Sequence, residues 1–207
     1  MFLDTPPRHE MPARLVRLIT GLAFFGFGVA LMVRAELGLS PWEVLHQGIS
    51  FNTGILLGTV GILVGFLVLF GWIPLNEKPG IGTVANVIMI GIVIDLSLWR
   101  LPLITSTPLR WALLVTGVTM IAVATSLYIG AGLGPGPRDG LMTGLAKRGW
   151  PIGAVRVGLE ISVLVIGWLL GGTVGIGTVL FAFGVGPIVH FTLPWLTVES
   201  SVGQQLG

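Results

Sequence analysis

Cysteine is absent from this 207-residue chain, and charged residues are scarce. Without cysteine there can be no disulfide framework, no thiolate nucleophile and no cysteine-ligated zinc or iron–sulfur centre. Charged residues make up 10% of the chain, against about 25% in an ordinary soluble domain. Hydrophobic residues make up 53%. The usual water-facing surface cannot be built from this composition, so we expect an integral membrane protein covered mostly by lipid.

Motifs for nucleic-acid binding and for catalysis are also missing. The formal net charge is +2, but the 11 lysines and arginines are scattered between apolar runs, so no basic patch for a nucleic acid forms. The chain contains no H-E-x-x-H zinc motif, no G-x-S-x-G elbow, no Walker loop and no dinucleotide fingerprint in its strand context. We therefore expect no enzyme activity, no cofactor, no metal site and no nucleic-acid partner.

The chain consists mainly of long apolar runs. Runs of this kind are long enough to cross about 30 Å of hydrocarbon as helices. They are bounded by charges, prolines and paired glycines, and they predict six membrane spans near 15–33, 55–73, 81–99, 111–129, 154–170 and 175–195.

The spans divide the chain into two similar parts. We expect an N-terminal tail over 1–14, a three-helix repeat over 15–100, a connecting loop over 101–109, a second three-helix repeat over 110–196 and a C-terminal tail over 197–207. With both tails on the cytoplasmic side, lysine and arginine are in excess on that side. The opposite side then holds only Arg34, Arg100 and Arg110. This bias favours cytoplasmic termini.

An internal duplication supports the two repeats. The pentapeptide GIGTV at 80–84 recurs at 175–179, and Gly38 and Pro41 match Gly134 and Pro137 at a separation of 96 residues. Three spans per half is an odd number, so the second copy should enter the membrane from the opposite side. The predicted fold is thus an all-α membrane protein of two inverted three-helix repeats. Such symmetry is typical of secondary transporters, but two fused helical units can also form an inert scaffold.

Short proline-broken segments follow the first and fourth spans. Ser40, Pro41 and Glu43 have the pattern of a helix start, with a cap, a first-turn proline and a capping-box acid. Residues 136–139 repeat the pattern and include Arg138 and Asp139. One interpretation is that these acids cap their helices and do nothing else. Alternatively, the segments are re-entrant helices whose N-termini face a cavity, where Arg138 would hold an anionic group.

Ionisable residues within the predicted spans are costly in hydrocarbon and indicate function. Arg156 and Glu160 are four residues apart and can pair along one helix face. Thr59 and Leu63 are expected at the equivalent positions of the first half, which would leave that half without this pair. Asp95 and His190 occupy equivalent positions of the two repeats.

The inverted arrangement predicts two polar clusters on opposite sides. Asp95 would lie with Glu43 and His46, and His190 with the charged residues of the second half. The candidate substrate-binding or gating residues are Glu43, His46, Asp95, Arg138, Asp139, Arg156, Glu160 and His190.

Three segments carry a family resemblance. Residues 31–48 (LMVRAELGLSPWEVLHQG), 132–142 (GLGPGPRDGLM) and 175–179 (GIGTV) resemble the YczE/YyaS/YitT family of bacterial inner-membrane proteins. The likeness covers residues 15–195 and is strongest to the YczE branch; the soluble C-terminal domain of the YitT branch has no counterpart here. The resemblance implies a bacterial cytoplasmic membrane and supplies no substrate.

Two functional hypotheses follow. The first is a small-solute transporter, as a monomer or homodimer, that binds an anionic or zwitterionic solute between the proline-broken segments and works by alternating access. The second is a membrane protein that transports nothing and stabilises or regulates a partner protein, with its charges serving as caps and interface contacts.

Overall fold

The computed structural model describes residue 7 and residues 9–198, and all regular structure in that part of the chain is helical. The predicted C-terminal tail lies almost entirely outside the described residues, as do most of residues 1–8. Eight helices follow one another: α1 (Met11–Ala35), α2 (Pro41–Thr53), α3 (Leu57–Trp72), α4 (Ile81–Arg100), α5 (Thr107–Gly130), α6 (Pro137–Ala146), α7 (Ile152–Leu169) and α8 (Ile176–Leu196).

Membrane crossing is within reach of five of these helices, judged by length and apolar character: α1, α4, α5, α7 and α8. A sixth crossing results if α2 and α3 count as one broken span, since they bend by 115° at a short break. The break falls at Gly54, whose φ of 74° is a left-handed conformation that glycine adopts without strain. The all-helical membrane architecture expected from the sequence is confirmed.

The two halves contain the same elements in the same order. The prolines that begin α2 and α6, Pro41 and Pro137, are 96 residues apart, and Ile81 and Ile176, which begin α4 and α8, are 95 apart. Each half thus holds four helices, because the short segment after the first span of each half is itself helical.

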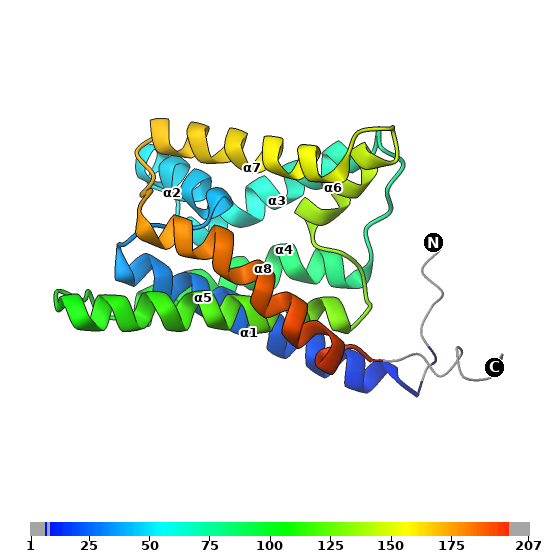
Figure 1. The fold of residues 1–207 in the computed structure, drawn as a ribbon, viewed down its shortest axis with the longest axis horizontal. Helices are drawn as coiled ribbons and strands as arrows, with labels where there is room; N and C mark the ends of the chain where they lie inside the picture. Colours follow the sequence, from blue (N-terminus) through cyan, green and yellow to red (C-terminus); the bar gives the residue numbers. More distant parts are fainter. Residues whose placement is uncertain (1–6, 8, 199–207) are drawn as a thin grey trace.

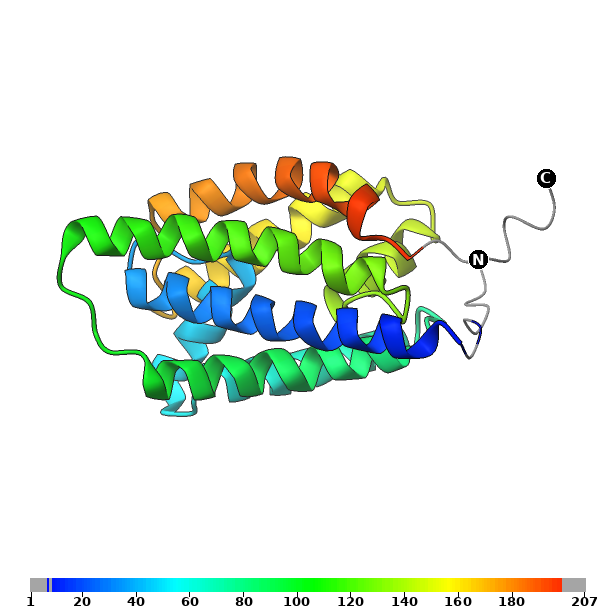
Figure 2. The ribbon, with the colours of Figure 1, turned by 90° about the horizontal axis from the view of Figure 1, so that it is seen from below.

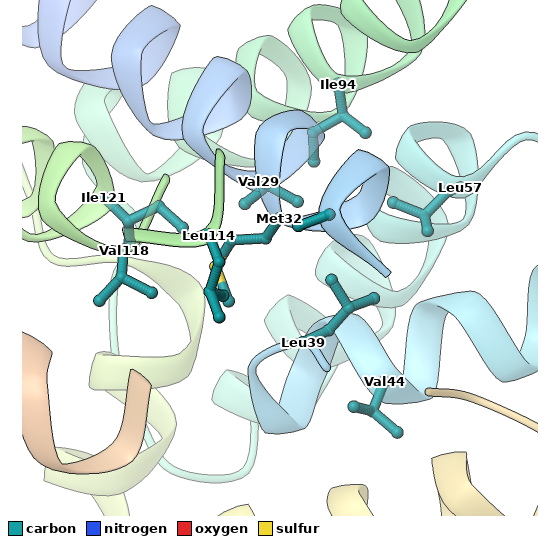
Figure 3. Close-up of a cluster of buried hydrophobic side chains, with 10 residues drawn as sticks. Val29, Met32, Leu39, Val44, Leu57, Ile94, Leu114, Val118 and Ile121 are labelled. Carbon is teal, nitrogen blue, oxygen red and sulfur yellow. The ribbon is translucent and has the colours of Figure 1, made fainter. Parts of the chain in front are cut away.

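Helices α1 and α5, the first helices of the two halves, run in opposite directions. Helix α1 runs from the right end of the molecule to the left in both ribbon views, and α5 beside it runs from left to right (Figures 1 and 2). The start of α1 and the end of α8 therefore lie at the same end of the molecule. The main core lies between α1 and α5, where Val29 and Met32 meet Leu114, Val118 and Ile121 (Figure 3).

The repeated GIGTV segments join the halves reciprocally. At the start of α4, the Gly82 amide donates to the Leu133 carbonyl at 2.9 Å, in the loop before α6. At the start of α8, the Gly177 amide donates to the Leu37 carbonyl at 2.7 Å, in the loop before α2. These two bonds are here called the reciprocal clamp. Each copy of the motif fixes the loop that precedes the short helix of the opposite half.

The close approach in the clamp makes its glycines sensitive to substitution. A Cβ on Gly82 would lie 2.9 Å from the Leu133 carbonyl oxygen, and one on Gly177 would meet the Gly38 carbonyl. We expect Gly82→Val and Gly177→Val each to lower the free energy of unfolding by about 1–3 kcal/mol through overpacking. Thermal unfolding of the purified protein in detergent measures this effect.

The matched control is Gly158→Val on α7, because a Cβ at Gly158 meets nothing within 4 Å. Equal losses of stability in all three variants would show that the valines act through helix propensity and that the clamp contributes nothing.

Candidate functional site

A cavity of about 470 Å³ lies between the two halves, and all eight helices contribute to its wall. The duplication determines which positions face it. Asn86, Val87, Ile90 and Gly91 of α4 line the cavity, and so do the four residues of α8 that lie 95 positions later: Phe181, Ala182, Val185 and Gly186. Residues 40–43 and 136–139, which are 96 apart, line it at the starts of α2 and α6. The cavity is therefore built from equivalent faces of both repeats.

The starts of the two short helices meet in this cavity through an ion pair. Nη2 of Arg138 donates to Oε1 of Glu43 at 2.6 Å, and the guanidinium carbon lies 4.9 Å from the centre of the Trp42 ring. The Glu43 side chain is only 4% exposed and that of Arg138 28%. A carboxylate buried to this degree needs a partner, and its partner comes from the opposite half.

His46 and Asp139 flank this pair. Nδ1 of His46 lies 4.0 Å from Oε1 of Glu43. The Tyr128 hydroxyl donates to Oδ2 of Asp139 at 3.3 Å. Glu43, His46, Arg138 and Asp139 were all named from the sequence as candidate site residues, and all four line this cavity.

Arg156 and Glu160 line the cavity from α7 as the expected pair, with Nε and Oε1 3.2 Å apart. Their side chains are 65% and 33% exposed. The prediction that Thr59 and Leu63 are the counterparts of Arg156 and Glu160 is wrong. Helices α3 and α7 begin 95 residues apart, at Leu57 and Ile152, so the counterparts are Gly61 and Gly65, which also face the cavity.

Asp95 and His190 do not line the cavity. The Asp95 carboxylate accepts bonds from the Gly58 amide at 2.6 Å and from the Thr59 amide and hydroxyl at 2.8 Å, and so holds α4 to the start of α3. His190 is exposed on α8, and its side chain makes no hydrogen bond within the described chain. The prediction of two polar clusters on opposite sides of the membrane is wrong as well, because Glu43 of one expected cluster bonds directly to Arg138 of the other.

The cavity residues that the sequence analysis did not name as site residues include Ser40, Trp42 and Tyr128. Ser40 occupies the expected N-cap position, but its side chain makes no capping bond. Its Oγ and the Nε1 of Trp42 are buried and have no hydrogen-bond partner among the described residues. A usable signal for Trp42 was its position, 96 residues before Arg138 in the duplicated segment.

These features define a class: a duplicated helical membrane protein with one charged cavity between its halves. The chain belongs to the family whose model carries the description "Family of unknown function (DUF6198)", which matches residues 12–194. This membership agrees with the resemblance to the YczE branch.

Named relatives are uncharacterised. An "Uncharacterized protein" of Haemophilus influenzae is 40% identical over 85% of this chain and 81% of its own length. The "Uncharacterized membrane protein YczE" of Bacillus subtilis is 35% identical over 90% of this chain and 88% of its own. "Uncharacterized protein YyaS" of the same organism is 26% identical over 84% and 89%. No solved structure matches.

The Glu43–Arg138 pair should couple the two halves energetically. Arg138→Met leaves the buried Glu43 carboxylate without its cation, and we expect it to lower the free energy of unfolding by about 3 kcal/mol. The double variant Glu43→Gln/Arg138→Met removes both charges and should recover most of that loss. Unfolding in detergent, followed for the two single variants and the double variant, gives the coupling energy.

Arg156→Met provides the control, since it breaks a pair of the same chemistry on the exposed wall and should change stability by less than about 1 kcal/mol. A double variant as unstable as Arg138→Met would contradict the coupling.

Proposed function

We propose that this protein is a small-solute transporter of the bacterial cytoplasmic membrane, with both termini cytoplasmic. The solute carries an anionic group, alone or as part of a zwitterion, and binds in the cavity between two inverted repeats that alternate in access. The observation that carries this proposal is that equivalent helix pairs of the two halves are in different arrangements around one charged cavity.

The first half is closed at the pair α3 and α4. A Cβ on Gly58 would meet the carbonyl oxygen of Gly91, and a Cβ on Gly91 would meet that of Gly58, so the two backbones are in contact. The Asp95 carboxylate bridges the same two helices. Glycine at both positions is what permits this approach.

The second half is open at the pair α7 and α8. The counterparts of Gly58 and Gly91, each 95 residues later, are Gly153 and Gly186, and a Cβ on either meets nothing within 4 Å. His190 stands where the first half has the bridging Asp95. The second half therefore keeps the glycines that would permit contact, without making the contact.

Exposure of the cavity wall follows the same difference. Arg156, on α7, has 65% of its side chain exposed, whereas Glu43, on α2, has 4%. The cavity is thus accessible beside α7 and covered on the side of α2 and α3.

Because α3 and α7 run in opposite directions, closing one helix pair and opening the other would move the cavity opening from one end of the molecule to the other. Helix α3 begins toward the left of the molecule, and α7 begins toward the right, the side from which α1 also starts (Figure 1). If the halves exchange arrangements, contact between Gly153 and Gly186 closes the present opening, and separation of Gly58 from Gly91 opens the other end. Rocking of one repeat against the other about a fixed site is the usual mechanism of inverted-repeat transporters.

Bulky side chains at the open glycines should lock the protein. Gly153→Leu/Gly186→Leu should fit the present arrangement, where an added Cβ meets nothing within 4 Å at either position, but block contact between α7 and α8. Because the chain has no cysteine, one cysteine at Ala182 on the cavity wall reports access. An impermeant maleimide should label it from both faces in the parent protein and from one face in the locked variant, in right-side-out and inside-out vesicles.

The control is Gly158→Leu, because an added Cβ there also meets nothing within 4 Å and its counterpart is already a leucine, Leu63; it should label like the parent. Labelling of the parent from one face only, under all conditions, would instead favour the static partner-binding protein. A doubly substituted variant that still labels from both faces would show that these glycines form no gate.

A further inference from the structure

Two hydrogen-bonding groups in the cavity wall have no partner. Oγ of Ser40 and Nε1 of Trp42 are buried, in residues that are 2% and 6% exposed, and neither has a hydrogen-bond partner among the described residues. Both residues line the cavity. The indole N–H can only donate, and the hydroxyl can donate. A buried donor left unpaired is costly, which indicates that an acceptor oxygen belongs in this part of the cavity.

Positive potential surrounds the same place. Ser40 and Trp42 flank the first residue of α2, whose opening amides have no partners within the helix. Helix α6 begins in the same cavity. Arg138 lies against the Trp42 ring and donates to Glu43 through Nη2, the one hydrogen bond that its guanidinium makes within the described chain. The other N–H groups of the guanidinium can donate hydrogen bonds to a carboxylate.

The rest of the cavity has an excess of negative charge. Three acidic residues and two arginines line it. Glu43 pairs with Arg138, and Glu160 pairs with Arg156. Asp139 is the remaining acid, and its hydrogen bonds come from two neutral donors, the Tyr128 hydroxyl and the Gly136 backbone amide. Asp139 adjoins Arg138 in sequence, so a cation held by Asp139 would lie close to an anion held by Arg138.

The remaining wall is apolar, with Val64, Val68, Ile90, Ile94 and Ile121 among its residues. A volume of about 470 Å³ falls in the range of small-molecule sites, about 300–1,000 Å³. The ligand is thus small and joins an acid group, a cationic group and an apolar body.

We infer that the cavity binds a compact zwitterion of the α-amino acid type with an apolar side chain. Its carboxylate accepts hydrogen bonds from Ser40, Trp42 and Arg138, and its ammonium group lies against Asp139. This assignment rests on the proposed transport function for the route by which the solute enters and leaves, but not for the binding itself.

Thermal unfolding in detergent with defined probes tests the assignment. The probes are alanine, valine, leucine, methionine and phenylalanine, each compared with its deaminated acid and its decarboxylated amine; for leucine these are 4-methylpentanoate and 3-methylbutylamine. At least one amino acid should raise the melting temperature, while its acid and amine should not. A shift equal for the acid and the amino acid, or no shift with any amino acid, would overturn the assignment.

Variants locate the binding groups. Ser40→Ala and Trp42→Phe each remove one unpaired donor, and Trp42→Phe keeps a ring for Arg138 to lie against. Each should lower the affinity for the stabilising amino acid roughly tenfold, since a hydrogen bond to a charged group is lost. Ser40→Ala should leave the melting temperature without ligand unchanged or higher, because the hydroxyl has no partner to lose.

The controls are Ser162→Ala and Trp168→Phe on the exposed face of α7, which should bind like the parent. Undiminished binding in both Ser40→Ala and Trp42→Phe would refute the carboxylate site. The maleimide test is independent of these probes. Alternating access without amino-acid binding would refute this assignment alone, and amino-acid binding without alternating access would refute transport alone.

Discussion

The reciprocal clamp is the interaction on which the rest of the structure depends. Hydrocarbon offers no hydrogen-bond partners, so non-helical backbone at membrane depth must find its partners within the protein. The loops before α2 and α6 are non-helical, and the glycine amides at the starts of α8 and α4 bind them. Since each motif serves the opposite half, neither half can complete its own broken segment. The position of both short helices, and with it the cavity, follows from this exchange.

The same exchange explains why the charges meet. Trp42 and Glu43 are equivalent to Arg138 and Asp139, so the duplication has placed different chemistry at matching positions. Where the two helix starts face one another, the arginine of one half meets both the ring and the carboxylate of the other. Helix capping accounts for an acid at each start, but it does not account for the arginine. The pair is a contact between halves, made possible by their divergence after duplication.

Much of the fold could be read from the sequence, because membrane spans are governed by length and hydropathy. The order of helices, the duplication and the proline-broken segments were all predicted, and six of the eight named site residues line one cavity. Span counting could not settle α2 and α3, because a bend of 115° has no hydropathy signature. The sequence assigned Asp95 and His190 to the site because ionisable residues are rare in spans. Only the structure shows that Asp95 binds the amides that begin α3.

Unmet hydrogen bonds were beyond sequence reasoning altogether. Ser40 looks like an ordinary cap, and nothing in its neighbourhood along the chain indicates that its hydroxyl is left without a partner. Likewise, the difference between the glycine pairs of the two halves is invisible in the sequence, where Gly58 and Gly91 match Gly153 and Gly186. What distinguishes them is the packing of the helices around them.

The substitution of Arg156 and Glu160 for Gly61 and Gly65 has an energetic consequence. Two identical repeats that exchanged arrangements would give end states related by symmetry, and hence of equal free energy. Here α7 carries Arg156 and Glu160, whereas its counterpart α3 carries no charged residue. In the present arrangement those charges lie on the exposed wall, and closure of that wall would cost part of their hydration. In the proposed transport cycle the two end states would therefore differ in free energy, and the empty protein would favour the one that keeps these charges hydrated.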